Sequence, residues 1–355
     1  MDSIKANDSI IHFNDNCYSS LNKHIAEHNF SKIFILVDEN THEHCLPIVL
    51  KQLETSISID IIEIESGEIN KTIDTCLGVW NTLSDLDADR KSLMINIGGG
   101  VITDLGGFVA CTFKRGIAYI NVPTTLLSMV DASVGGKTGV DLGHLKNQIG
   151  VISNPNLVLI DTTFLDTLAG NQMRSGLAEM LKHGLITGHS YWDKFQDLSK
   201  LSLNDLDQLI YDSVIIKKNV VEHDPFENNL RKTLNFGHTL GHAIESHFLS
   251  SDHKTTLLHG EAIVVGMILA CYISTKLTGF PKADTDAIKA LFIGHYGKVT
   301  IEKNEHAAIM ELMKYDKKNN HGNINFVLLK AIGAAKIDCI VDDNIIIDAF
   351  EYYNQ

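Results

Sequence analysis

Basic residues are scarce in this sequence, in which 30 Lys and Arg are outnumbered by 44 Asp and Glu. The formal net charge of the 355 residues is −14, and no long block of Lys or Arg occurs. Nucleic acids and anionic membranes require a cationic surface that neutralises phosphates. The composition therefore argues against both as partners, and any anionic ligand is expected to meet a local basic cluster.

Cysteines are also few, with six in the chain and no Cys-x-x-Cys pair. Their spacing argues against a disulfide framework and a thiolate zinc knuckle, and it fits a reducing cytoplasm. The first 15 residues contain no apolar stretch long enough for a signal peptide. The most apolar run, residues 262–273, lies between Glu261 and Lys276 and is too short to span a bilayer. We therefore expect a cytoplasmic protein in which this run is a buried helix.

Proline is rare as well, so that no Pro-rich linker marks a domain boundary among the five prolines. Length alone nevertheless predicts two domains, because single cores rarely grow to this size. Short β-branched runs alternate with helical stretches in the first half of the chain, which predicts a mostly parallel sheet with crossover helices. Long helical segments follow after Asp161.

These patterns predict an α/β, Rossmann-like domain over residues 1–165 and a mostly α-helical domain over residues 166–355. The expected strands are residues 32–37, 57–64, 93–97, 118–122 and 157–160. The expected later helices are residues 171–186, 203–221, 235–248 and 261–278. One crossover helix is expected to pack an apolar stripe on the sheet, because five apolar residues recur at helical spacing: Ile73, Cys76, Leu77, Trp80 and Leu83.

A triple glycine, residues 98–100, follows a predicted strand and precedes a helical run that begins at Val101. Glycines let the backbone approach a dinucleotide pyrophosphate, and the helix N-terminus supplies amide donors. Thr103 stands where the usual pattern has its third glycine, so a simple tight turn is the alternative. A second glycine pair before Lys137 resembles the end of a P-loop. Asp131 occupies the position where a P-loop requires glycine, which argues against an ATPase.

His238 and His242 are four residues apart, so both imidazoles lie on one face of a helix. The chain has 17 histidines, and a structural role explains such spacing equally well. A third histidine, His259, precedes a predicted helix, and Glu179 lies on another. Catalytic zinc sites commonly use three His or carboxylate ligands and leave one position open. The spacing predicts such a site without choosing among the histidines.

Several long motifs, between residues 71 and 329, resemble those of the 3-dehydroquinate synthase family. They are GGGVITD, RGI, PTTLLSMVDASVGGKTGVD, KNQIG, SGLAEMLKHG, LRKTLNFGHTLGHAIE, LHGEAI and YDKKNNHG. The resemblance implies an NAD-binding α/β domain followed by a helical metal-binding domain. It also implies a cytoplasmic homodimer that uses NAD and one zinc or cobalt ion.

The resemblance assigns metal binding to Glu179, His238 and His259, which makes His242 a substrate-side residue. It implies NAD contacts from Asp38, Glu68, Lys71, Gly99, Gly100, Val101, Asp104, Thr124, Thr125, Lys146 and Thr167. It implies substrate contacts from Arg115, Asp131, Lys137, Lys146, Asn147, Lys182, Lys217, Arg231, Asn235, His242 and Lys318. Arg115 corresponds to a residue that reaches the phosphate site of the partner subunit. Proposed catalytic roles fall to Asp131, Lys137, Lys182, Lys217, Arg231, Asn235 and His242.

The family's substrate, 3-deoxy-D-arabino-heptulosonate 7-phosphate, carries a carboxylate and a phosphate. The Arg231 guanidinium, together with Lys217, suits the carboxylate because it can bind both oxygens. The implied lyase reaction comprises oxidation by NAD, elimination of phosphate, return of the hydride and an aldol closure to 3-dehydroquinate, within the shikimate pathway. Alternatives are a sister cyclase whose sugar phosphate lacks a carboxylate, a polyol dehydrogenase that releases NADH, and a non-enzymatic binding protein of the same fold.

Overall fold

The protein is described here by a computed structural model. It describes residues 1–143, 145–197, 203–251, 253–315 and 324–355. Contacts divide the chain into two compact units, residues 1–173 and residues 174–355. Each unit has its own buried core.

The first unit is built on a seven-stranded sheet with the order β1-β2-β9-β6-β5-β3-β4. Its strands are β1 (Ile4–Ala6), β2 (Ser9–Phe13), β3 (Ile33–Asp38), β4 (Ile59–Ile64), β5 (Leu93–Gly98), β6 (Ala118–Pro123) and β9 (Leu157–Ile160). All neighbouring strands are parallel except the β1–β2 pair. The central strands β3 and β5 are almost wholly buried, as expected when helices cover both faces. The predicted parallel sheet is confirmed, and the structure adds β1 and β2.

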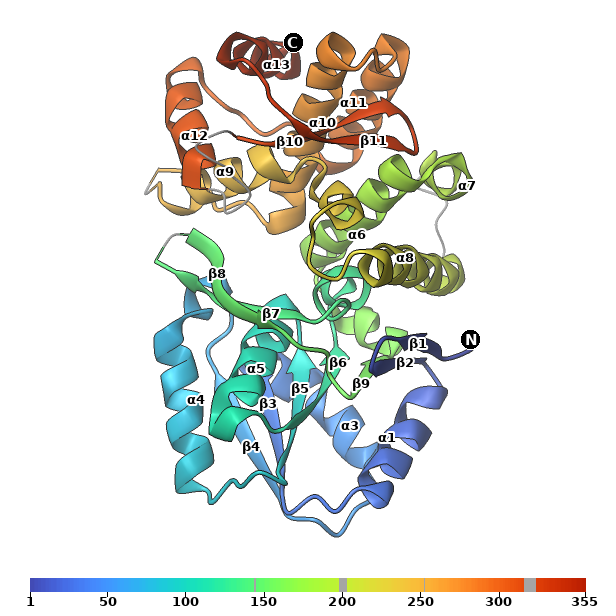
Figure 1. Ribbon diagram of the computed structural model, residues 1–355, viewed down its shortest axis with the longest axis vertical. Helices are drawn as coiled ribbons and strands as arrows, with labels where there is room; N and C mark the ends of the chain where they lie inside the picture. The colour runs from blue at the N-terminus through green and yellow to red at the C-terminus, as the bar shows by residue number, and fades with distance from the viewer. Residues whose placement is uncertain (144, 198–202, 252, 316–323) are drawn as a thin grey trace. The chain divides into compact units, whose positions relative to one another are not determined.

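Helices cover this sheet on two faces (Figure 1). They are α1 (Asn16–Glu27), α2 (Glu39–His44), α3 (Leu46–Gln52), α4 (Ile73–Asp85) and α5 (Gly100–Thr112). The connections through α1 to α3 move along the sheet in one direction, and those through α4 and α5 move back. Right-handed crossovers therefore place the two groups on opposite faces.

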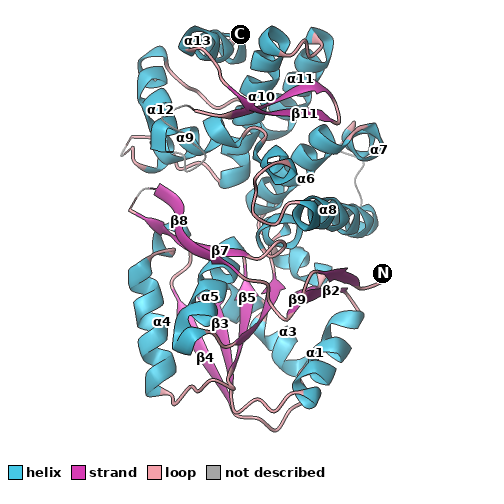
Figure 2. Ribbon diagram, viewed as in Figure 1, coloured by secondary structure: helices cyan, strands magenta, loops and turns pink. Residues whose placement is uncertain are grey.

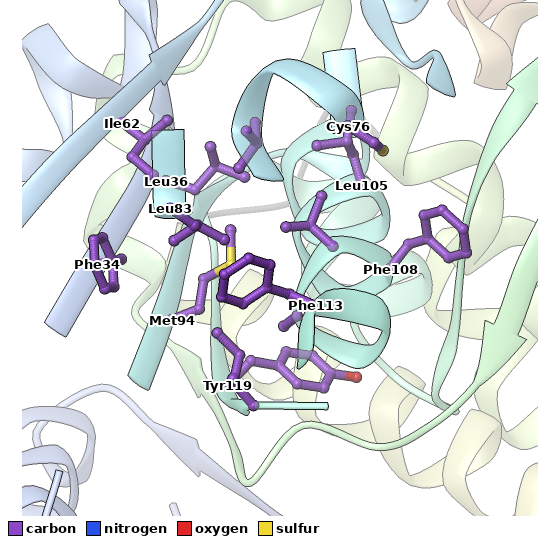
Figure 3. Close-up of a cluster of buried hydrophobic side chains, with 14 of the residues drawn as sticks. Phe34, Leu36, Ile62, Cys76, Leu83, Met94, Leu105, Phe108, Phe113 and Tyr119 are labelled. Carbon is purple, nitrogen blue, oxygen red and sulfur yellow. The ribbon is translucent and has the colours of Figure 1, made fainter. Parts of the chain in front are cut away.

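The core under α4 and α5 is a cluster of aliphatic and aromatic side chains (Figure 3). Phe34 and Met94 come from the sheet, and Leu83 and Leu105 come from the two helices. Burying one such side chain stabilises a fold by about 1.5–3 kcal/mol. This cluster holds α5, and with it the glycine turn, against the sheet.

The apolar stripe predicted for α4 is only partly correct. Cys76 and Leu83 are buried as predicted, and Val79 joins them. Ile73 and Leu77, however, are 38% and 52% exposed. The buried stripe is centred on Cys76 and Leu83, and Leu77 lies about 100° further around the helix from Cys76, so it points away from the sheet.

An antiparallel hairpin that the sequence pattern did not predict packs against α5. It consists of β7 (Lys137–Leu142) and β8 (Leu145–Ile152). A Cβ atom on Gly106 would lie 2.1 Å from Asn96 Oδ1 of the sheet, and one on Gly107 would lie 2.5 Å from Thr138 Cγ2 of β7. The two glycines thus permit close packing on opposite sides of α5.

The second unit is mostly helical (Figure 2). Its helices are α6 (Gly170–Thr187), α7 (His189–Trp192), α8 (Leu203–His223), α9 (His238–Leu249), α10 (His259–Leu277), α11 (Lys282–Tyr296), α12 (His306–Leu312) and α13 (Asp343–Asn354). A hairpin of β10 (Phe326–Ala331) and β11 (Ala334–Cys339) accompanies them. The four predicted helices are confirmed as α6, α8, α9 and α10.

Helix α10 forms the centre of this unit. In the described part of the chain it is the one helix long and apolar enough to cross a membrane, but 72% of its apolar window is buried inside the protein. Nearly every residue from Gly260 to Ser274 is inaccessible. The helix is a core helix, as the sequence predicted.

Candidate functional site

The glycine turn lies at the point of the sheet where the order of the strands reverses. From β3 the chain proceeds to β4, whereas from β5 it proceeds to β6 on the other side. In open α/β sheets, ligands bind outside the carboxyl ends of the two strands at such a point. Here β3 ends at Asp38, and β5 ends at Gly98, just before Gly99 and Gly100 begin α5. Thr124 donates its N–H to Gly98 O (3.0 Å). The residues at these strand ends that are predicted to bind the dinucleotide thus lie together at the carboxyl ends of the strands.

Thr103 is compatible with this turn. Its buried hydroxyl donates to Gly99 O at 3.2 Å within the first turn of α5, which also contains Val101. The close helix–sheet approach that a third glycine usually allows occurs one turn later, at Gly106. Asp38, at the end of β3, caps α2 by accepting the N–H of Thr41 at 2.8 Å.

Five predicted site residues form a lysine cluster, defined as Glu68, Lys71, Asp104, Lys146 and Asn147. Lys71 Nζ donates to Asp104 Oδ2 and to Asn147 Oδ1, both at 2.7 Å. Lys146 pairs with Glu68 at 3.0 Å. Burial would lower the pKa of Lys71, but the carboxylates of Asp104 and Glu68 outweigh it and raise that pKa. Lys71 is therefore a fixed cation.

Asp141, which the sequence interpretation did not single out, organises this cluster. Its N–H donates to Lys71 O at 2.9 Å, and its Oδ1 accepts the N–H of Asn147 at 2.6 Å. Asn147 has a left-handed φ of 52°, which this carboxylate helps to hold. Burial raises the pKa of Asp141 to about 6; Glu68 adds to the rise, and Lys71 opposes it.

The remaining predicted residues of the first unit lie on other elements. Thr125 and Asp131 follow β6, with Asp131 in a π-helical turn, and Lys137 begins β7. Thr167 ends a 3-10 helix. Arg115 is exposed, and its φ of 71° is left-handed.

The second unit brings Glu179, His238 and His259 together, here called the metal cluster. Glu179 is fully buried on α6, and the two histidines are the first residues of α9 and α10. Glu179 Oε1 lies 3.5 Å from His238 Nε2 and 3.6 Å from His259 Nε2. Two donor atoms around a tetrahedral zinc ion lie about 3.4 Å apart, because each bond is about 2.0–2.2 Å long. The spacing and chemistry of this donor set therefore fit such an ion.

His242 lies beside the metal cluster. Its ring nitrogen lies within 4.8 Å of those of His238 and His259, so the three histidines form a second possible donor set. His238 and His259 belong to both sets. The short distances from Glu179 Oε1 to both histidines favour Glu179 as the third donor, in line with the resemblance.

Close helix packing positions His259. A Cβ atom on the following residue, Gly260, would lie 2.2 Å from Ser175 O, and the Gly260 N–H donates to Ser175 Oγ at 2.9 Å. Ser175 lies one turn before Glu179 on α6. The contact that requires glycine at position 260 therefore also brings His259 to Glu179.

The two histidines have different partners: His259 faces carboxylates, whereas His238 faces a backbone carbonyl. His259 Nδ1 lies 3.1 Å from Glu245 Oε2, and His238 Nδ1 lies 3.1 Å from Phe236 O. Burial would lower the pKa of His259, but Glu245 and Glu179 outweigh it and raise that pKa to about 9. Carboxylates that favour an imidazolium also favour a bound metal cation. Lys182, one turn after Glu179, donates to Glu179 Oε2.

Lys217, Arg231 and Asn235 lie on α8 and the 3-10 helix Leu230–Asn235 of the same unit. Lys217 and Arg231 are both buried. Arg231 Nη1 donates to Pro225 O at 2.7 Å, and Asn235 Nδ2 donates to Glu227 Oε1 at 2.6 Å. The predicted Lys318 lies outside the described residues.

Asp224 shapes the loop before Arg231, and the sequence interpretation missed it. Its carboxylate accepts backbone N–H groups from Asn228 (2.9 Å), Asn229 (2.7 Å) and Arg231 (3.0 Å). Burial would raise the pKa of Asp224, but these donors lower it. The carboxylate therefore fixes the backbone from which the Arg231 side chain extends.

The fold is shared with solved structures of other proteins. It matches a 2-deoxy-scyllo-inosose synthase complexed with carbaglucose-6-phosphate, NAD+ and Co2+, with a TM-score of 0.86 and 24% identity over 99% of this chain and 100% of the other. A 2-epi-5-epi-valiolone synthase from Streptomyces hygroscopicus, with NAD+ and Zn2+ bound, matches with a TM-score of 0.83 and 21% identity over 100% and 98% of the two chains.

Sequence comparison then identifies the family. Residues 61–175 match 3-dehydroquinate synthase N-terminal, and residues 176–319 match 3-dehydroquinate synthase C-terminal. The 3-dehydroquinate synthase of Parabacteroides distasonis is 40% identical over 339 residues, 95% of each chain. That of Streptococcus pyogenes serotype M3 is 36% identical over 343 residues, 96% of this chain and 95% of the other. The chain belongs to the 3-dehydroquinate synthase family and is an enzyme with that activity.

Proposed function

We propose that this enzyme converts 3-deoxy-D-arabino-heptulosonate 7-phosphate to 3-dehydroquinate and phosphate in the cytoplasm, using recycled NAD and one zinc or cobalt ion. Family membership carries the activity. The metal cluster supports the ion, because its two imidazoles and one carboxylate are the ligands that zinc and cobalt take. The cyclase structures with NAD+ and Co2+ or Zn2+ are consistent with both cofactors.

The residues at the sheet's switch point would hold NAD, which supplies a hydride acceptor when bound. The N-terminus of α5 offers backbone N–H groups and the positive end of a helix dipole to the pyrophosphate. The Asp38 carboxylate lies at the end of the neighbouring strand, where it would accept from a ribose hydroxyl.

The metal cluster would hold the ion, which supplies a Lewis acid that lowers the pKa of a substrate hydroxyl. With the ion bound, Glu179 would partly neutralise its charge, whereas His238 and His259, binding through a ring lone pair, would add none, so a net positive centre would remain. Lys182 donates to the second Glu179 oxygen and so fixes the direction of the first.

The buried pair of Lys217 and Arg231 would bind the substrate carboxylate. A guanidinium fork pairs with two carboxylate oxygens, whereas a sugar phosphate without a carboxylate offers it no such partner. This pair favours the keto acid phosphate over the substrate of a sister cyclase. Asp131, Lys137, Asn235 and His242 remain predicted phosphate-binding or proton-handling groups.

We also propose a homodimer in which Arg115 reaches the partner subunit. Its exposure supports a guanidinium that a partner subunit could reach. Sedimentation velocity would give twice the mass of the chain. A monomeric, fully active enzyme would contradict the dimer.

Phosphate release tests the function. The purified enzyme is given the heptulosonate phosphate, zinc or cobalt, and NAD well below the substrate concentration. Release of phosphate far beyond the NAD added would support a synthase that recycles its cofactor. Release from a hexose phosphate but not from the keto acid phosphate would indicate a sister cyclase, and NADH accumulation with a polyol would indicate a dehydrogenase.

A further inference from the structure

Glu245 is a buried carboxylate next to the metal cluster that no assignment above includes among the ligands. It lies on α9 and is 5% exposed. It follows His238 by seven residues and His242 by three, so all three side chains share one helix face. Its Oε2 lies 3.1 Å from His259 Nδ1 on the neighbouring helix α10.

The His259 ring faces carboxylates on both sides. Nδ1 faces Glu245, and Nε2 faces Glu179 Oε1 at 3.6 Å. A carboxylate only accepts, so the Glu245 contact keeps a proton on Nδ1, and Nε2 is the nitrogen that a cation would bind in place of a proton. We propose that Glu245 is a positioning residue that fixes the tautomer and orientation of His259, so that Nε2 binds the divalent ion.

The two histidines of the cluster are supported differently. His238 Nδ1 faces a neutral backbone carbonyl, Phe236 O, at 3.1 Å, whereas His259 Nδ1 faces an ionised side chain. A carboxylate behind a ligating imidazole increases its basicity, and outer partners of this kind typically change metal affinity 10- to 100-fold. His259 is also the more accessible of the two rings. It therefore depends more on its side-chain partner for a fixed orientation.

Close packing of the two helices makes this arrangement rigid. A Cβ atom on Gly266 of α10 would lie 2.0 Å from Gly237 O, immediately before α9. The backbones of α9 and α10 consequently approach within contact distance. Glu245 and His259 face each other from two elements that have little freedom to separate.

The inference rests on the proposed function, because it assumes that the enzyme binds a divalent ion. The test compares Glu245→Ala, Glu245→Gln and Glu245→Asp in the full-length enzyme. Zinc affinity is measured by chelator competition, and zinc loss is followed after mixing with excess chelator. Glu245→Ala is expected to weaken zinc binding 10- to 100-fold. Glu245→Gln keeps an acceptor without the charge, and its zinc affinity is expected to lie between that of Glu245→Ala and that of the wild type.

Glu305→Gln is the matched control. Glu305 Oε1 lies 3.0 Å from His247 Nε2 in the same unit, so this is another Glu–His pair that is not part of the metal cluster. Its zinc affinity should equal that of the wild type. NAD affinity, measured by fluorescence, should be unchanged in every variant and so report folding.

Wild-type zinc affinity and release rate in both Glu245→Gln and Glu245→Ala would overturn the positioning role. If Glu245→Ala does not fold, Glu245→Gln alone decides the question by the same criterion. A wild-type enzyme that binds no zinc or cobalt would instead contradict the metal part of the proposed function. The two failures are therefore distinguishable.

Discussion

Replacing Asp141 by Asn should stabilise the first unit. Asp141 is only 9% exposed, and burial, reinforced by Glu68, raises its pKa from 3.8 to about 6. At neutral pH the folded protein therefore contains a poorly solvated carboxylate. Asn has the same shape and still offers Oδ1 to the Asn147 N–H, a hydrogen bond of 2.6 Å in the wild type.

The magnitude follows from linkage between protonation and folding. One pKa unit corresponds to about 1.4 kcal/mol, so a rise from 3.8 to about 6 amounts to at most about 3 kcal/mol. A raised folded-state pKa means that the stabilising protonation is complete below about pH 4 and is lost as the pH rises through about 6. Asn does not ionise, so Asp141→Asn should gain about 1–3 kcal/mol of unfolding free energy above pH 7.

The assay is urea unfolding of both proteins between pH 4 and pH 8, without NAD or metal. The difference in unfolding free energy should be small at pH 4, reach about half of its maximum near pH 5 and level off by about pH 7. In thermal unfolding, the Tm of Asp141→Asn should exceed that of the wild type by about 2–4 °C for each kcal/mol gained. Asp104→Asn, which removes the negative charge of the group that accepts from Lys71 at 2.7 Å, should destabilise the protein instead. A difference that does not change with pH, or an Asp141→Asn variant less stable at pH 8, would refute the reasoning.

Three further predictions concern the metal, the substrate and packing. His238→Ala should abolish stoichiometric zinc binding, whereas His242→Ala should retain it, as measured by elemental analysis after dialysis. Loss of zinc in both variants would favour the donor set of three histidines. Arg231→Ala should lower kcat/KM for the keto acid phosphate about 10- to 100-fold through loss of charged hydrogen bonds, and an unchanged value would remove it from the site. Gly106→Ala should unfold at a markedly lower urea concentration than the wild type, because its Cβ would lie 2.1 Å from Asn96 Oδ1. The control is Gly78→Ala, whose Cβ meets no atom within 4 Å; it should leave the stability unchanged or raise it by up to about 1 kcal/mol.

Sequence periodicity predicted the elements whose burial is regular. Strands β3 and β5 are continuous apolar runs because they are covered on both faces, and α10 is apolar throughout because it is central. The β7–β8 hairpin escaped because a glycine interrupts each strand and no residue of β8 is fully buried, so that β8 has no apolar periodicity. In α4 the spacing was correct and Cys76 and Leu83 are buried as predicted, but Leu77 is apolar and yet 52% exposed.

The residues that support the site were harder to predict than those assigned to it by resemblance. Asp141 acts on Asn147 six residues away, and Asp224 acts on Arg231 seven residues away, through loops with no periodic signal. Glu245 does have a signal, because it shares a helix face with His238 and His242. That spacing could not reveal the His259 contact, since His259 belongs to a different helix and only tertiary packing brings it near.

The contact of Gly260 with Ser175 has a thermodynamic consequence for the second unit. One peptide carries both a predicted metal ligand, His259, and the residue that seats α10 on α6. Separating these helices would therefore also dismantle the ligand set. An ion that binds only the assembled cluster adds RT ln(1 + [M]/Kd) to stability, about 2.7 kcal/mol at a hundredfold excess over Kd. The supply of metal would then set the stability of this unit as well as its chemistry.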